Sequence, residues 1–125
     1  MQDQPQPADI LAATRDFLRD QVLPALSGRL AFDLRVAING LELVERQLRL
    51  APAAEAAEAE RLAALLGRAG GLTDLNAALA AAIGDGTVDL ATPGLRDHLL
   101  RTTAEKLAVD QPKYARFRRL TEEGL

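Results

Sequence analysis

The run from Leu30 to Leu50, LAFDLRVAINGLELVERQLRL, is the feature that most constrains the fold of this chain. Its apolar residues recur at steps of three and four, which is the period of an α-helix with a buried stripe. This stripe consists of Leu34, Ala37, Ile38, Leu41, Val44 and Leu48. A second, partly apolar line consists of Val36, Gly40, Leu43 and Leu50. A helix with two apolar lines needs neighbours on two sides, so the run predicts the central helix of a bundle.

Gly40 lies in the middle of this predicted helix. Glycine inside a helix costs about 1 kcal/mol relative to alanine because it gives up more backbone freedom on folding. A glycine at such a position is explained if another backbone packs closely against it. We therefore predict that Gly40 is a contact point between helices.

Length and composition predict one all-α domain over residues 1–125. The chain is long enough to bury a core without disulfides or metals, and its 48% of apolar residues are mainly alanine and leucine. Aromatic residues make up only 3%, and β-branched residues are sparse, so helices are favoured over a sheet. We predict a compact bundle of about five helices around the central one.

Prolines and glycines divide the chain into these helices. Residues 1–7 are predicted to be extended, and a first helix runs from Ala8 or Asp9 until Pro24 ends it near Leu23. After Leu50, Pro52 is predicted to break the central helix. A separate third helix then follows as far as Gly67 or Gly70.

Two further helices and a tail complete the prediction. Thr73 is predicted to cap a fourth helix that stops at Gly84. Thr92 is predicted to cap a fifth, with Pro93 as its first residue and an end near Asp110. The fifth helix is predicted to run through Leu95, Leu99, Leu100, Thr103 and Leu107. Residues 112–125 form a tail that folds back as a last turn or two.

Charge and composition exclude several classes of function. A net charge of −3 argues against nucleic-acid binding, which needs a surplus of Lys and Arg. The first residues do not have the pattern of a signal peptide, and no uncharged apolar run reaches the roughly 18 residues of a membrane span. We therefore expect a cytoplasmic protein that binds neither nucleic acid nor membrane.

Catalytic and cofactor signatures are also missing from the sequence. There is no cysteine, and a serine triad would have to use Ser27 and His98, although no nucleophile-elbow motif surrounds Ser27. His98 is predicted to be a partly buried or surface histidine rather than a base or ligand. The glycine pairs are helix stops without the lysine of a phosphate loop. We expect no cofactor, no metal site and no catalytic residues.

Polar residues concentrate on one side of the predicted central helix. Asp33, Arg35, Asn39 and Glu42 form this cluster. Three interpretations stay open at this point: a solvated helix face, a buried hydrogen-bond network between helices, or a ligand or partner site. We take Arg35, Asn39 and Glu42 as candidate binding residues.

A second candidate group follows the fifth helix. Pro112 ends that helix, Asp110 can accept hydrogen bonds in the turn, and Tyr114 offers an apolar ring with one polar tip. We predict that these residues clasp the chain where it turns back. Asp110 and Tyr114 are also candidates for closing a pocket beside the Arg35 cluster.

Three segments carry a resemblance to a known family: FLRDQVLPAL, GRLAFDLRVAING and KLAVDQPKYA. Together they resemble a family of small bacterial all-helical proteins of unknown function, over nearly the whole chain. The family pattern is matched at Arg35, Ala37, Asn39, Asp110, Pro112 and Tyr114, whereas Asp33 stands where the family often has histidine. That departure weakens an acid–base role for Asp33.

The resemblance also implies a cellular context. Members of the family are often encoded beside acyl-CoA dehydrogenase-like and phosphotransferase-like proteins, which implies an accessory role. We therefore expect a non-catalytic accessory or interaction protein, which binds such a neighbouring enzyme or associates with itself. The alternative is a small-molecule-binding protein or enzyme subunit linked to acyl-CoA or phosphotransfer metabolism.

Overall fold

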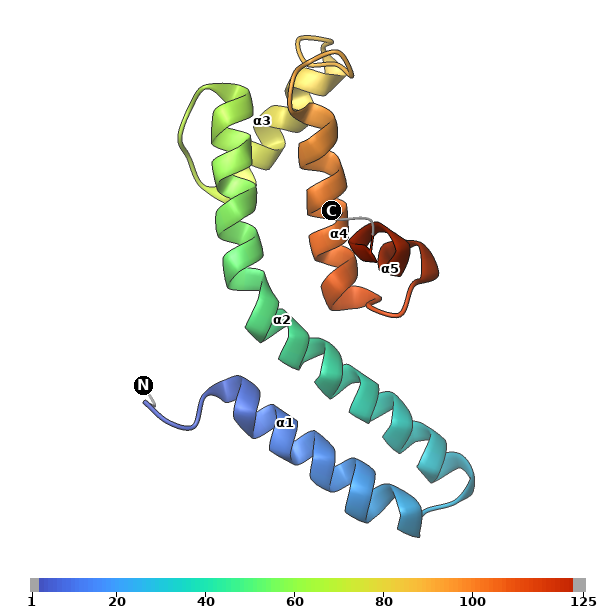
Figure 1. Ribbon diagram of the computed structural model, residues 1–125. Helices are drawn as coiled ribbons and strands as arrows, with labels where there is room; N and C mark the ends of the chain where they lie inside the picture. The colour runs from blue at the N-terminus through green and yellow to red at the C-terminus, as the bar shows by residue number, and fades with distance from the viewer. Residues whose placement is uncertain (1–2, 123–125) are drawn as a thin grey trace. The chain divides into compact units, whose positions relative to one another are not determined.

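The computed structural model describes residues 3–122, and these residues form five α-helices without a strand. The prediction of an all-α protein is confirmed. The elements in chain order are α1 (Pro7–Phe17), a π-helical segment η1 (Leu18–Val22), a 3₁₀ segment η2 (Leu23–Ala25), α2 (Gly28–Leu66), α3 (Leu72–Gly84), α4 (Leu95–Asp110) and α5 (Ala115–Glu122) (Figure 1). The chain forms two compact units, Met1–Leu50 and Ala51–Leu125, so a single domain over 1–125 stays a prediction.

The first unit is a helical hairpin in which α1 runs antiparallel to the first part of α2 (Figure 1). Its two arms are joined by ion pairs from Asp9 to Arg49, from Arg15 to Glu45 and from Arg19 to Glu42. From one pair to the next, the residue number rises on the first arm and falls on α2. This opposite progression is what an antiparallel register requires. Gly28, whose φ is 61°, occupies the left-handed conformation at the reversal into α2.

The apolar contact between these arms is narrow. Ala8, Ala31 and Ile38 are the buried apolar residues of the hairpin. Leu34 and Leu41 are half-buried on the same side of α2. The side of α2 that faces inward in this unit therefore follows the steps 31, 34, 38 and 41.

Pro52 does not break the helix as predicted, because α2 continues through it to Leu66. Proline removes one backbone donor and normally ends or bends a helix. Here the residues that follow it are mostly Ala, Glu, Leu and Arg, which are strong helix formers, and they carry the helix on. The boundary between the two units, after Leu50, falls beside this proline.

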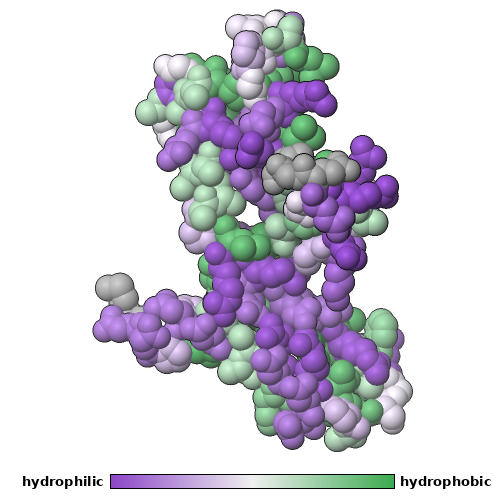
Figure 2. Space-filling view, in the orientation of Figure 1, coloured by the Kyte–Doolittle hydropathy of each residue, from purple (hydrophilic) through white to green (hydrophobic). Residues whose placement is uncertain are grey.

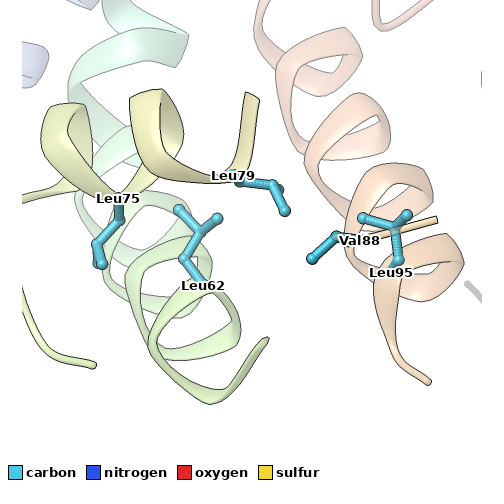
Figure 3. Packing of buried hydrophobic residues seen from close by; sticks show 5 residues of the cluster. All are labelled: Leu62, Leu75, Leu79, Val88 and Leu95. Carbon is cyan, nitrogen blue, oxygen red and sulfur yellow. The ribbon is translucent and has the colours of Figure 1, made fainter. Parts of the chain in front are cut away.

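The second unit holds the main apolar core. Figure 3 shows its buried cluster, which consists of Leu62, Leu75, Leu79, Val88 and Leu95. Leu62, on α2, is fully buried against Leu75 and Leu79 from α3. Val88, from the α3–α4 loop, and the first residue of α4 complete the cluster. The residues of α2 after Pro52 thus supply the centre of this unit.

The two predicted threonine caps are wrong. α3 begins after Gly71 and α4 after Gly94, and neither helix has a side-chain cap. Thr92 instead lies in the loop, where its hydroxyl oxygen accepts a hydrogen bond from the backbone N–H of Asp89 at 3.0 Å. Gly94 has a φ of 87°, a left-handed conformation that interrupts helical geometry, so α4 starts at Leu95 rather than at Pro93.

The residues after α4 form a turn and a short helix. The backbone N–H of Tyr114 donates to the carbonyl of Gln111 at 2.9 Å, and α5 then begins at Ala115. Figure 1 shows α5 beside α4. Asp110 is exposed at the end of α4 and the Tyr114 side chain is about half exposed, at 49%. The turn is present as predicted, but its tyrosine is not buried.

Candidate functional site

A line of exposed residues runs along α2 on the side opposite the hairpin contact. We call this line the outer face of α2; it consists of Phe32, Val36, Gly40, Leu43, Gln47 and Leu50. Steps of three and four place the six on one side of the helix. All six are exposed and none carries a charge. Phe32 and Val36 are each 56% exposed.

The outer face continues into further exposed apolar residues. Leu30, Val44 and Leu48 lie along one flank of α2, and Phe17 is exposed on α1. Figure 2 shows hydrophobic residues, in green, at the protein surface among hydrophilic residues, in purple. Single exposed apolar residues are ordinary on proteins, whereas a contiguous apolar patch marks an interaction site.

Gly40 lies at the middle of the outer face. Among the described residues of the first unit, a Cβ added there would meet nothing within 4 Å, so the predicted helix contact at Gly40 is not made within the hairpin. The absence of a side chain lowers the surface locally. Another backbone could approach α2 here more closely than at any larger residue.

The candidate residues Arg35, Asn39 and Glu42 lie beside the outer face, along one of its edges. Arg35 and Asn39 are exposed, whereas Glu42 is half-buried and paired with Arg19 of η1. Glu42 therefore helps to join the arms of the hairpin. Asp33 is paired with Arg29 one turn earlier, at 2.8 Å.

The other candidates, Asp110 and Tyr114, belong to the second unit. They flank the α4–α5 turn, and their exposed side chains leave them accessible to a partner. That they close a pocket beside Arg35 stays a prediction.

A second candidate site is a pocket in unit Ala51–Leu125. It has a volume of about 430 Å³ and is lined by Arg61, Ala64, Leu65, Thr92, Pro93, Gly94 and His98. The guanidinium of Arg61 donates to Glu105 at 3.1 and 2.7 Å and to the hydroxyl of Thr102 at 3.3 Å. Nearby, the side chain of Asn76 donates to the buried carboxylate of Glu58 at 3.0 Å.

His98 is buried in the wall of this pocket, with only 2% of its surface exposed. Burial lowers the pKa of the imidazole, and the neighbouring charge of Arg61 lowers it further. The carboxylates of Glu58 and Glu105 act in the opposite direction, and Lys106 adds to the lowering. The neutral form of the ring is therefore favoured.

Of the residues through which the fifth helix was predicted to run, Leu95 is buried and Leu107 is half-buried. Leu99, Leu100 and Thr103 are exposed. The covered side consists of Leu95, His98, Thr102, Glu105 and Val109, which are buried or half-buried. These residues follow the steps 3, 4, 3 and 4 of a helical stripe. His98, Thr102 and Glu105 were missed because they are polar, and apolar periodicity does not register polar residues.

Two further structural findings bear on the class of site. Within residues 3–122, no cluster of three or more His, Cys, Asp or Glu side chains is arranged to hold a metal ion. None of the helices in that range combines the length and apolar character needed to cross a membrane.

Comparison with known protein families then places the chain. A family model described as "Domain of unknown function (DUF6285)" matches residues 24–114. The chain belongs to this family. The DUF6285 match begins at Pro24 and ends at Tyr114, so it includes the outer face of α2, the Arg61–His98 pocket and all the candidate residues. No curated protein and no solved structure shows a match to the chain.

Proposed function

We propose that this DUF6285 protein is a non-catalytic accessory protein that binds another protein through the outer face of α2. The observation that carries the proposal is the uncharged, exposed line from Phe32 to Leu50. The cores of protein interfaces are apolar and depleted in charged residues. Among residues 3–50, the hairpin buries Ala8, Ala31 and Ile38 as its apolar residues, so it gains little stability from its own packing.

The partner surface that fits best is a helix with an apolar face and an acidic edge. Apolar side chains of such a helix would cover Phe32, Val36 and Leu43, and its backbone would approach at Gly40. Acidic residues along its edge would lie beside the exposed guanidinium of Arg35. An amphipathic helix laid along an apolar surface is a common mode of recognition.

The family resemblance suggests which protein carries that helix. An acyl-CoA dehydrogenase-like or phosphotransferase-like enzyme, encoded nearby in a bacterial genome, is the partner we propose. A cytoplasmic location belongs to the same proposal.

Co-purification from the native host under mild salt tests this function. Tagged wild type should retain one such enzyme, and Val36→Glu should lose it because a charge would be buried at the centre of the contact. Leu90→Glu is the matched control, since Leu90 is an apolar residue that is 83% exposed and belongs to the α3–α4 loop rather than to the outer face of α2. The captured enzyme must be identified by mass spectrometry and must bind the purified protein with the same dependence on Val36.

Two results would contradict the proposal. Equal capture of the enzyme by both variants would show that the outer face of α2 is not the docking surface. Light scattering that finds a dimer of the wild type and a monomer of Val36→Glu would show that a second copy of this chain occupies the face instead.

A different observation favours a second candidate function, the binding of a small molecule. The pocket beside Arg61 and His98 has the size of a ligand site, since such sites measure roughly 300–1,000 Å³. Its chemistry is independent of the outer face of α2 and is argued next.

A further inference from the structure

The pocket of the second unit lies at the N-terminal end of α4. Thr92, Pro93 and Gly94, which directly precede this helix, form one wall. Ala64 and Leu65 of α2 form another wall and are apolar. The site therefore combines a helix terminus with an apolar surface.

The backbone donors at this terminus have no side-chain cap. The first N–H groups of a helix lack partners inside the helix, and a Ser, Thr, Asp or Asn side chain usually accepts from one of them. Here Gly94 occupies the cap position, and no side chain takes that role. The N-terminal end of a helix also carries partial positive charge, so it attracts an anion.

Two buried nitrogens beside the pocket point independently to a polar ligand. Within residues 3–122, Nδ1 of His98 and Nε of Arg61 are both buried without a hydrogen-bond partner. A buried polar atom left unpaired costs roughly 1–3 kcal/mol, so native proteins seldom keep one without a reason. Both side chains line the same pocket.

The two hydrogen bonds from Arg61 to Glu105 fix the orientation of the guanidinium. They use its terminal nitrogens and leave Nε unoccupied. Glu105 cancels much of the positive charge, so a free anion is not attracted by Arg61 alone. The remaining attraction comes from the N-terminal end of α4 and from the unpaired Nε–H of Arg61.

We propose that this pocket binds a small organic oxyanion, a carboxylate or phosphate group attached to a short apolar chain. The oxyanion lies at the N-terminal end of α4, beside Gly94 and His98. The apolar chain lies against Ala64, Leu65 and Pro93. A volume of about 430 Å³ suits a compact ligand and is too small for a dinucleotide.

An NMR titration of the ¹⁵N-labelled full chain tests the proposal. The probes are butyrate, which joins a carboxylate to a short apolar chain, butyl phosphate, which carries the other oxyanion, and butanol, which has the same chain without charge. We expect saturable shifts of the amide signals of Arg96, Asp97 and His98 with at least one anion. Butanol should cause much smaller shifts. The comparison of the two anions decides between a carboxylate and a phosphate ligand.

A variant that fills the pocket completes the test. Ala64 lines the pocket and is exposed, so Ala64→Leu should narrow the site without disturbing the core. We expect it to weaken anion binding at least about tenfold. Ala80→Leu is the control, because Ala80 is also exposed in the same unit, on α3, and does not line the pocket.

Several results would overturn the ligand site. They are the absence of saturable binding by either anion, equal binding of butanol, or unchanged anion affinity in Ala64→Leu. The proposed docking surface is tested separately, because Val36→Glu should lose the partner protein and keep the anion affinity. Failure of one proposal therefore leaves the other standing.

Discussion

Arg61 of α2 donates two hydrogen bonds to Glu105 of α4, and together they form an ion pair whose shortest distance is 2.7 Å. Their side chains are only 19% and 28% exposed, so the pair is largely shielded from water. It joins the two helices that frame the pocket. A bidentate arginine–carboxylate pair is among the stronger hydrogen-bonded contacts in proteins because both members are charged and the geometry is fixed.

Removing one member of this pair should destabilise the second unit. Glu105→Ala leaves the Arg61 guanidinium partly buried without its carboxylate, and we expect a loss of about 1–3 kcal/mol in the free energy of unfolding. The control is Asp97→Ala, which breaks an exposed pair with Arg101 on the same helix and should cost less than about 0.5 kcal/mol. Urea unfolding measures both, and equal losses would contradict a special role for Glu105.

Leu62 should be the most sensitive position of the apolar core. It is fully buried, at 0% exposure, within the cluster from α2, α3 and α4. Leu62→Ala should lower the free energy of unfolding by about 2–5 kcal/mol. Leu41→Ala should cost less, because Leu41 is only half-buried in the hairpin. If urea unfolding gave the larger loss for Leu41, the location of the core would be wrong.

Gly94 should not tolerate alanine. Its φ of 87° is left-handed, and an added Cβ would meet Cδ2 of Leu65 at 3.4 Å. We expect Gly94→Ala to cost about 1–2 kcal/mol. Gly84→Ala is the control, since Gly84 ends α3 with a helical conformation and open space around it, and it should be neutral or slightly stabilising. Thermal unfolding compares the two, and a stabilised Gly94→Ala would refute the strained turn.

The buried His98 should make stability depend on pH. Its pKa is lowered in the folded protein from an unfolded value near 6.5, so the unfolded chain binds the proton more readily. The contribution of neutral His98 is complete above that value and is lost as the pH falls from about 6.5 to the lowered pKa. Four charged groups act on the ring. Arg61 and Lys106 add to the lowering of its pKa, whereas Glu58 and Glu105 raise the pKa and so keep the shift from being larger.

The comparison of wild type with His98→Gln isolates this effect. Between neutral pH and about pH 5, the wild type should lose more stability than the variant, whatever their absolute stabilities. Parallel curves of unfolding free energy against pH would show that His98 does not titrate as proposed.

The helices themselves were largely predictable from sequence, because apolar residues at helical spacing and the bounding glycines and prolines are local signals. Pro52 shows the limit of a local signal, since strong helix formers after the proline let α2 continue. Thr92 shows another, since Gly94 moved the start of α4 past the expected cap.

The candidate sites were less predictable. On α4 the covered stripe includes His98, Thr102 and Glu105, whose burial depends on partners from another helix, and such pairing does not show in apolar periodicity. On α2 the two apolar lines were visible in the sequence. Which of them is covered depends on α1, which packs on the side of Ile38 and leaves Val36 exposed.

Photo-crosslinking from Val36 tests the central claim most directly. A photoreactive phenylalanine analogue placed at Val36, on the outer face of α2, should crosslink to a separate enzyme chain when the protein is illuminated in its native host. The same analogue at Leu90 should not form that product. A crosslink from Val36 only to residues 51–125 of its own chain, or to a second copy, would contradict the claim that this face binds another protein.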